Sequence, residues 1–171
     1  MKKSGPARIV GILCIIFGVI AIVGGVATWV LVTNQLAAEK ITVSSDSAIM
    51  PGAPVNSPIT AYAQAEVINK HALEGSGGLT YAELGSEISK AKAAGDTAKA
   101  EELTAQRTSA MNASFLRASL FTSVVAYGVA LLVFGLGLMF ILVGWALGSL
   151  AKPVAVDSGA DSDVQSTPAQ A

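Results

Sequence analysis

Two long apolar runs stand out in the pattern of hydrophobic and polar positions along the chain. They extend from Ile9 to Val32 and from Ala118 to Leu150, and neither contains an acidic, basic or histidine residue. A helix needs about 20 apolar residues to cross the hydrocarbon core of a bilayer, and each run exceeds that length. The pattern predicts an all-α membrane protein in which two transmembrane helices form an antiparallel hairpin.

The segment between the runs, residues 33–117, is polar in character and is predicted to be a small helical extracytoplasmic segment. Ile41 to Val43 is predicted to form a short strand, and a loop containing proline and glycine follows it. A helix is expected from Pro58 to Glu74, with Ser57 as its N-cap. Its apolar face is expected to contain Ala61, Ala65, Ile68 and Ala72.

Two further helices are predicted before the second run ends. The capping box Thr80–Glu83 opens a short helix from Tyr81 to Ala93. From Thr97 to Val125 the chain contains no glycine or proline. A helix capped by Asp96 is therefore expected to begin outside the membrane and to continue unbroken into the second run. The residues expected to hold the first outer helix against it are Met111, Phe115 and Ala118.

Small residues recur at seven-residue spacing in both runs. This spacing keeps one nearly continuous stripe on a helix, and such a stripe lets two helix backbones approach closely in lipid. We expect the two stripes to meet within the hairpin, and any residual stripe to contact another membrane protein or a second copy of the chain. The expected helix-packing residues are Gly11, Gly18, Gly25, Ser123, Ala130, Gly137, Gly144 and, from a Gly-x-x-x-Gly pair, Gly148.

Basic residues near the runs predict the orientation of the chain. Lysine and arginine are enriched on the cytoplasmic side of a membrane, and residues 1–8 carry three of them. The first run is longer than the apolar part of a cleavable signal peptide, and no A-x-A site follows it. We therefore expect an uncleaved signal anchor, with both termini cytoplasmic and the middle segment outside. Residues 151–171 are polar and acidic, which predicts a disordered cytoplasmic tail.

Aromatic and basic residues at the ends of the runs are expected to lie at the two membrane surfaces, because their side chains combine an apolar body with a polar tip. Arg117 has a second expected role, since it can pair with Glu66 or Glu74 of the outer helix. The expected interface anchors are Trp29, Tyr127, Trp145, Arg8, Arg117 and Lys152.

Residues that carry chemistry are scarce. The net charge of −1 gives no electrostatic footprint for nucleic acid. His71 is the single histidine and is interpreted as a surface residue, whereas a non-haem iron site of the common facial type needs two. Cys14 is the single cysteine, so no intramolecular disulfide can form. The runs also lack the ionisable groups that ion and proton pathways use. We expect no catalytic or metal-binding residue and no cofactor.

The segments Ala61–Glu74 and Ala113–Ala126, together with the two runs, resemble a family of small two-span actinobacterial membrane proteins of unknown function. The resemblance covers roughly residues 8 to 150. Members often carry the automatic label of an aromatic ring-opening dioxygenase. The resemblance implies a two-span protein of a bacterial plasma membrane, and it supplies no functional residues.

Three functional hypotheses follow from these patterns. The first is a non-catalytic accessory or scaffold subunit of a membrane or cell-envelope complex, whose partners are the lipid bilayer and another membrane protein or a second copy of the chain. The second is a small homo-oligomeric channel. The third, which rests on the family label, is a dioxygenase-related enzyme subunit.

Overall fold

The computed structural model describes residues 5–150, and within this range all the regular elements are α-helices. The predictions for the basic N-terminal lysines, for Lys152 and for the tail at 151–171 concern residues outside that range. The helices are α1 (Gly5–Ala38), α2 (Pro58–Gly75), α3 (Tyr81–Ala93) and α4 (Thr97–Leu150).

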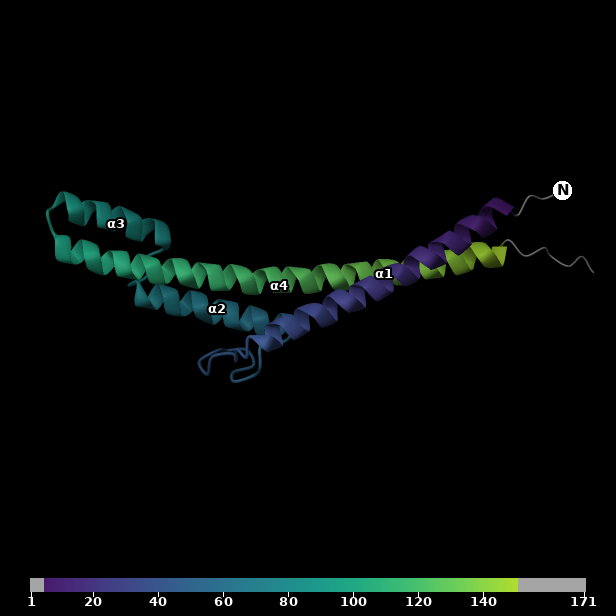
Figure 1. The fold of residues 1–171 in the computed structure, drawn as a ribbon, viewed down its shortest axis with the longest axis horizontal. Coiled ribbons are helices and arrows are strands. Elements are labelled where there is room, and N and C mark those ends of the chain that lie inside the picture. The colour runs from purple at the N-terminus through teal and green to yellow at the C-terminus, as the bar shows by residue number, and fades with distance from the viewer. Residues whose placement is uncertain (1–4, 151–171) are drawn as a thin grey trace, which may run out of the picture.

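Helix α4 organises the molecule. It contains 54 residues, so it is about 81 Å long at 1.5 Å per residue. The other three helices each pack against it, in the order α1, α2, α3 from its C-terminal to its N-terminal end (Figure 1). Each of the three runs in the direction opposite to α4. The first residues of α1 therefore lie beside the last residues of α4, while α3 lies at the far end of the rod.

The starts of the outer helices follow their local sequence. The Ser57 hydroxyl caps α2 by accepting a hydrogen bond from the Thr60 amide, and Pro58 is the first helical residue. Thr80 and Glu83 form the predicted capping box of α3. The Asp96 carboxylate accepts a hydrogen bond of 2.9 Å from the Lys99 amide at the start of α4. These predictions are confirmed, because each capping group satisfies an amide that the helix itself leaves unpaired.

The predicted strand at Ile41–Val43 is not a strand. The loop between α1 and α2 folds back on itself through one isolated antiparallel bridge, between Thr42 and Pro54. The Val43 amide donates to the Ala53 carbonyl at 2.8 Å, and the Val55 amide donates to the Ile41 carbonyl at 2.9 Å. Proline is compatible with this bridge because Pro54 occupies its non-hydrogen-bonded position, where an amide hydrogen would point away from Thr42.

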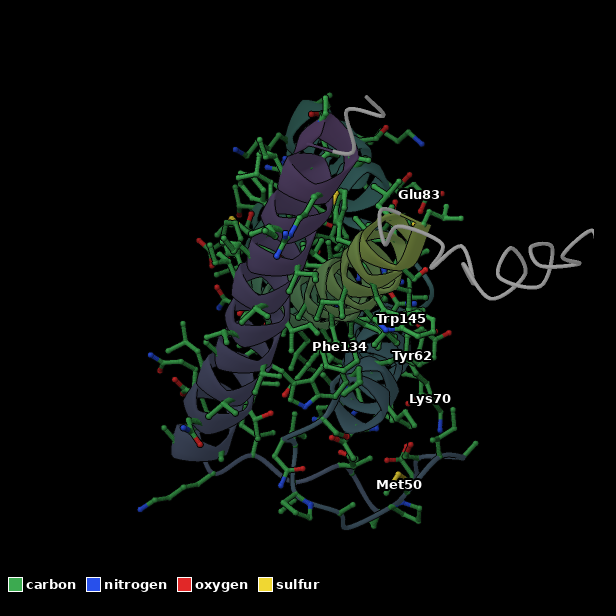
Figure 2. All side chains as sticks on the ribbon, turned by 90° about the vertical axis from the view of Figure 1, so that its right-hand side faces the viewer. Met50, Tyr62, Lys70, Glu83, Phe134 and Trp145 are labelled. Atoms are coloured by element: carbon green, nitrogen blue, oxygen red, sulfur yellow. The ribbon has the colours of Figure 1, made fainter. Side chains whose placement is uncertain are left out.

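Two small hydrophobic clusters hold the outer helices on α4. One joins the end of α1, the loop and α2 to α4, and its buried residues include Leu36, Val43, Val55, Ala61, Ala65, Leu120 and Tyr127. The second joins α3 to α4 through Leu84, Ile88, Leu103 and Ala110. The prediction that Phe115 and Ala118 pack against α2 is wrong, because both side chains are exposed. Figure 2 shows Lys70 of α2 and Glu83 of α3 on opposite sides of α4.

Two helices, α1 and α4, are long and apolar enough to cross a membrane. In the most apolar window of each, only 17% of the residues are buried. A core helix of a water-soluble protein is mostly buried. The exposed surface of these stretches is formed by large aliphatic and aromatic side chains, such as Phe17, Ile20, Leu132 and Trp145.

Candidate functional site

The contact between α1 and α4 is the main candidate for a functional surface. Three levels of close approach repeat along it, each seven residues from the next. Gly11 faces Gly144, Gly18 faces Gly137, and Gly25 faces Ala130. All six residues are buried. The helices therefore meet backbone to backbone at these levels, and dispersion contacts between main-chain atoms hold them together.

The geometry explains why these positions carry glycine. A Cβ atom on Gly11 would lie 2.9 Å from the Gly144 carbonyl oxygen, and one on Gly144 would lie 2.5 Å from the Gly11 carbonyl oxygen. The obstructing atoms belong to the backbone and cannot rotate away. At the third level Ala130 replaces glycine on α4, and there a Cβ on Gly25 would lie 2.8 Å from the Ala130 carbonyl oxygen.

The remaining predicted packing residues take other positions. A Cβ atom on Gly148 would meet open space. The amide nitrogen of Gly148 nevertheless lies near α1, because it would be 3.5 Å from a Cβ atom on Gly11. Ser123 is half-buried, and its hydroxyl donates to the Ser119 carbonyl of the same helix. Three further glycines, Gly24, Gly128 and Gly135, also face open space. Gly128 and Gly135 also lie seven residues apart, but no atom of α1 lies within 4 Å of a Cβ atom built on either.

Tyr127 lies where α1, the loop and α4 meet. Its side chain is only 1% exposed, and its ring packs edge-on against Trp29 with 4.6 Å between ring centroids. Its hydroxyl donates to the Asn56 carbonyl at 3.1 Å. A phenol has one proton to donate, so the Thr33 hydroxyl, 2.8 Å away, must donate to Tyr127.

The prediction of Tyr127 as a lipid-facing interface anchor is therefore wrong. Its polar tip is satisfied inside the protein, and the residue fixes the end of α1 and the loop onto α4. Sequence reasoning missed Thr33 and Asn56 as its partners, because the 94-residue and 71-residue separations carry no local signal. Among the other expected anchors, Trp145 is 70% exposed and Trp29 is 38% exposed. Arg8 is exposed at the start of α1.

Arg117 connects α4 to α2. Its Nη2 atom lies 3.5 Å from Oε1 of Glu66, which is one of the two carboxylates expected from the sequence. Its guanidinium also lies 5.2 Å from the centre of the Phe121 ring. The Phe121 ring in turn packs edge-on against Tyr62 of α2, with 5.9 Å between the centroids. Arginine is suited to this position because its planar head can pair with a carboxylate and cover an aromatic face at once.

A cluster of polar side chains connects the loop between α1 and α2 to the exposed face of α2. One oxygen of Asp46 accepts hydrogen bonds from Nζ of Lys70 at 3.0 Å and from Nε2 of His71 at 2.9 Å. The hydrogen bond from Lys70 is the main cause that lowers the pKa of Asp46 to about 2, and the bond from His71 adds to it. The same contact raises the pKa of Lys70. Because all three side chains are largely exposed, the cluster positions the loop without forming an enclosed site.

Residues 5–150 contain no group of three histidine, cysteine or acidic side chains that could hold a metal ion. The expectation that the protein uses no cofactor stays a prediction. Comparison of the chain with protein-family models, curated proteins and solved structures yields no match. The resemblance to the family of two-span proteins likewise stays a prediction.

Proposed function

We propose that this protein is a two-span integral membrane protein that serves as a non-catalytic accessory or scaffold subunit of a membrane or cell-envelope complex. Helix α1 and the C-terminal half of α4 form its antiparallel transmembrane hairpin. Both termini face the cytoplasm of a bacterial plasma membrane. Helices α2 and α3 and the N-terminal half of α4 form a cap on the outer side.

The observation that carries the proposal is the combination of surfaces on α1 and α4. Their facing sides approach through Gly11, Gly18 and Gly25, while their outward sides expose large hydrophobic side chains. In water such an outward surface would be unfavourable by about 25 cal/mol for each Å² of apolar area. In lipid it is favourable, and close backbone contact is the interaction that remains to hold two helices together.

The scaffold role rests on the continuity of α4. One unbroken helix leaves the membrane segment and carries both α2 and α3 on its outer half. A helix of this kind fixes the distance of the cap from the bilayer. Arg8 at the start of α1 supports a cytoplasmic N-terminus through the enrichment of basic residues on that side.

Cysteine labelling tests the topology. In a Cys14→Ala background, we would introduce Ser45→Cys in the loop, Leu132→Cys in the apolar part of α4 and Ser158→Cys in the tail. A membrane-impermeant maleimide applied to intact cells should label the first variant only. The third should react after permeabilisation, and the second should stay protected. Labelling of Leu132→Cys in intact membranes would overturn the hairpin.

Purification in native nanodiscs followed by mass spectrometry tests the scaffold role. We expect a second membrane protein to copurify with this chain in a fixed stoichiometry. This partner should remain bound when the lysate is used at low dilution. A monomer without any partner would contradict the scaffold proposal. A pure homo-oligomer would favour a small homo-oligomeric channel, which conductance in planar bilayers would then measure.

A further inference from the structure

Exposed hydrophobic side chains occur in the cap, and most of them gather at its base. Ile59 and Tyr62 in the first two turns of α2 are 59% and 42% exposed, and Phe115 and Leu116 of α4 are 65% and 55% exposed. We call these four residues the collar. Nearer the tip, between Thr97 and Ser114, the described part of α4 exposes no large hydrophobic side chain. Along α4 the exposed apolar surface therefore ends at the collar.

The collar lies at the outer end of the apolar part of α4. The edge-on contact between Tyr62 and Phe121, and the ion pair between Glu66 and Arg117, place the first turns of α2 beside residues 117–121 of α4. Since α4 has no break, the exposed apolar surface that begins at Leu150 continues along the helix to this level. The continuity makes the bilayer the natural occupant of the collar.

The thickness of a bilayer agrees with this placement. From Trp145, the expected anchor at the inner membrane surface, to Leu116, α4 rises about 44 Å at 1.5 Å per residue. A bilayer measures about 40–45 Å with its headgroup layers and about 30 Å without them. The apolar run of α1, from Ile9 to Val32, rises about 35 Å and covers the hydrocarbon core. The apolar surface of α4 therefore extends farther than that of α1 and passes through the outer headgroup layer.

We propose that the collar lies in the outer headgroup layer of the membrane, so that the base of the cap rests within the lipid surface. This inference rests on the proposed function. Tyr62 suits such a depth, because its ring is apolar and its hydroxyl reaches water. Arg117 lies at the same level, where the guanidinium group that pairs with Glu66 faces the lipid phosphates.

Spin labelling in proteoliposomes of phosphatidylethanolamine and phosphatidylglycerol tests the proposal. In the Cys14→Ala background, a nitroxide is attached to Ile59→Cys or Phe115→Cys in the collar. Leu132→Cys is the matched control in the hydrocarbon core, and Glu101→Cys is the control on the outer half of α4. All four parent side chains are exposed, so the label replaces no packed group. Collisions with oxygen and with a water-soluble nickel complex report the depth of each label.

We expect both collar labels to show a several-fold higher ratio of oxygen to nickel collisions than Glu101→Cys, and a lower ratio than Leu132→Cys. Collar labels that match Glu101→Cys, while Leu132→Cys stays deep, would overturn the collar and leave the hairpin intact. Collar labels shielded from both oxygen and nickel would also overturn it, because a partner protein would then cover that surface. Water exposure of Leu132→Cys would instead overturn the membrane hairpin itself.

Discussion

Gly18 and Gly137 face each other so closely that neither has room for a side chain. A Cβ atom on Gly18 would lie 2.6 Å from the Gly137 carbonyl oxygen, and one on Gly137 would lie 2.7 Å from the Gly18 carbonyl oxygen. The obstruction is reciprocal, and on both sides it comes from the backbone. The contact therefore sets the distance between α1 and α4 at the middle of their interface.

Substitution Gly137→Ala should weaken the packing of α1 on α4. The added methyl group must push the helices apart, and overpacking of this kind typically costs about 1–3 kcal/mol. Unfolding of the purified protein in mixed micelles of dodecyl maltoside and dodecyl sulfate would measure the change in the free energy of unfolding. The matched control is Gly135→Ala, two residues away on the same helix, because a Cβ there meets open space. Equal losses in the two variants would contradict the contact.

Substitution Tyr127→Phe should destabilise the junction of α1 with the loop while keeping the ring in place. It leaves the Asn56 carbonyl without its donor and the Thr33 hydroxyl without its acceptor. The expected cost is about 1–2 kcal/mol. Thermal unfolding and hydrogen exchange of residues 39–57 would detect it. Tyr62→Phe is the control, since that side chain is 42% exposed. An unchanged exchange rate in the loop after Tyr127→Phe would argue against the hydrogen bonds.

The attachment of the loop to α2 should depend on pH through Asp46. Its pKa is lowered from 3.8 to about 2, first by Lys70 and then by His71. A carboxylate whose pKa is lower in the folded state stabilises that state above its ordinary pKa, and the contribution disappears as the pH falls through the folded-state value. The attachment should therefore weaken between about pH 4 and pH 2.

Carboxyl carbon NMR of Asp46 measures this dependence directly. Lys70→Ala should move the pKa of Asp46 back towards its ordinary value, and His71→Ala should move it less. Glu87→Gln serves as a control, because that carboxylate pairs with Lys90 on α3 instead. A pKa near 3.8 in the unsubstituted protein would show that the cluster does not form.

Substitution Leu84→Ala should release α3 from α4. Leu84 is 0% exposed in a cluster with Ile88, Leu103 and Ala110, and removal of a buried leucine side chain costs about 2–5 kcal/mol. Because α3 has few other buried groups, we expect faster hydrogen exchange throughout α3 and unchanged exchange in α1. Ser89→Ala, on the exposed face of the same helix, should leave exchange unaltered. Loss of protection in α1 as well would show that the two clusters unfold together.

Local signals in the sequence were sufficient to predict where the outer helices begin. Ser57, Thr80 and Asp96 each act on an amide three residues ahead, so the chemistry that starts these helices is contained in a few neighbouring positions. The unbroken passage of α4 from the cap into the apolar run was predictable for the same reason. Helix formers fill that stretch, and nothing in it stops a helix.

The rotation of α4 about its own axis was not predictable from local signals. Phe115 and Ala118 were expected to face α2, whereas the structure places Leu120 in the cluster with α2 and Ala110 in the cluster with α3. The close contacts with α1 that constrain this rotation lie farther along α4, from Tyr127 to Gly144. Tyr127 illustrates the same limit, since a tyrosine in an apolar run is compatible with a lipid interface and with burial. Only the positions of Thr33 and Asn56 distinguish the two.

In the proposed membrane arrangement, the single helix α4 connects the bilayer directly to the tip of the cap. The tip at Thr97 lies about 30 Å of helix beyond Arg117 at 1.5 Å per residue. A tilt of about 10° within the bilayer would therefore displace the tip sideways by about 5 Å for this length of helix. A change in membrane thickness or lateral pressure that tilts the hairpin would thus be converted, without any rearrangement inside the cap, into a movement of α3.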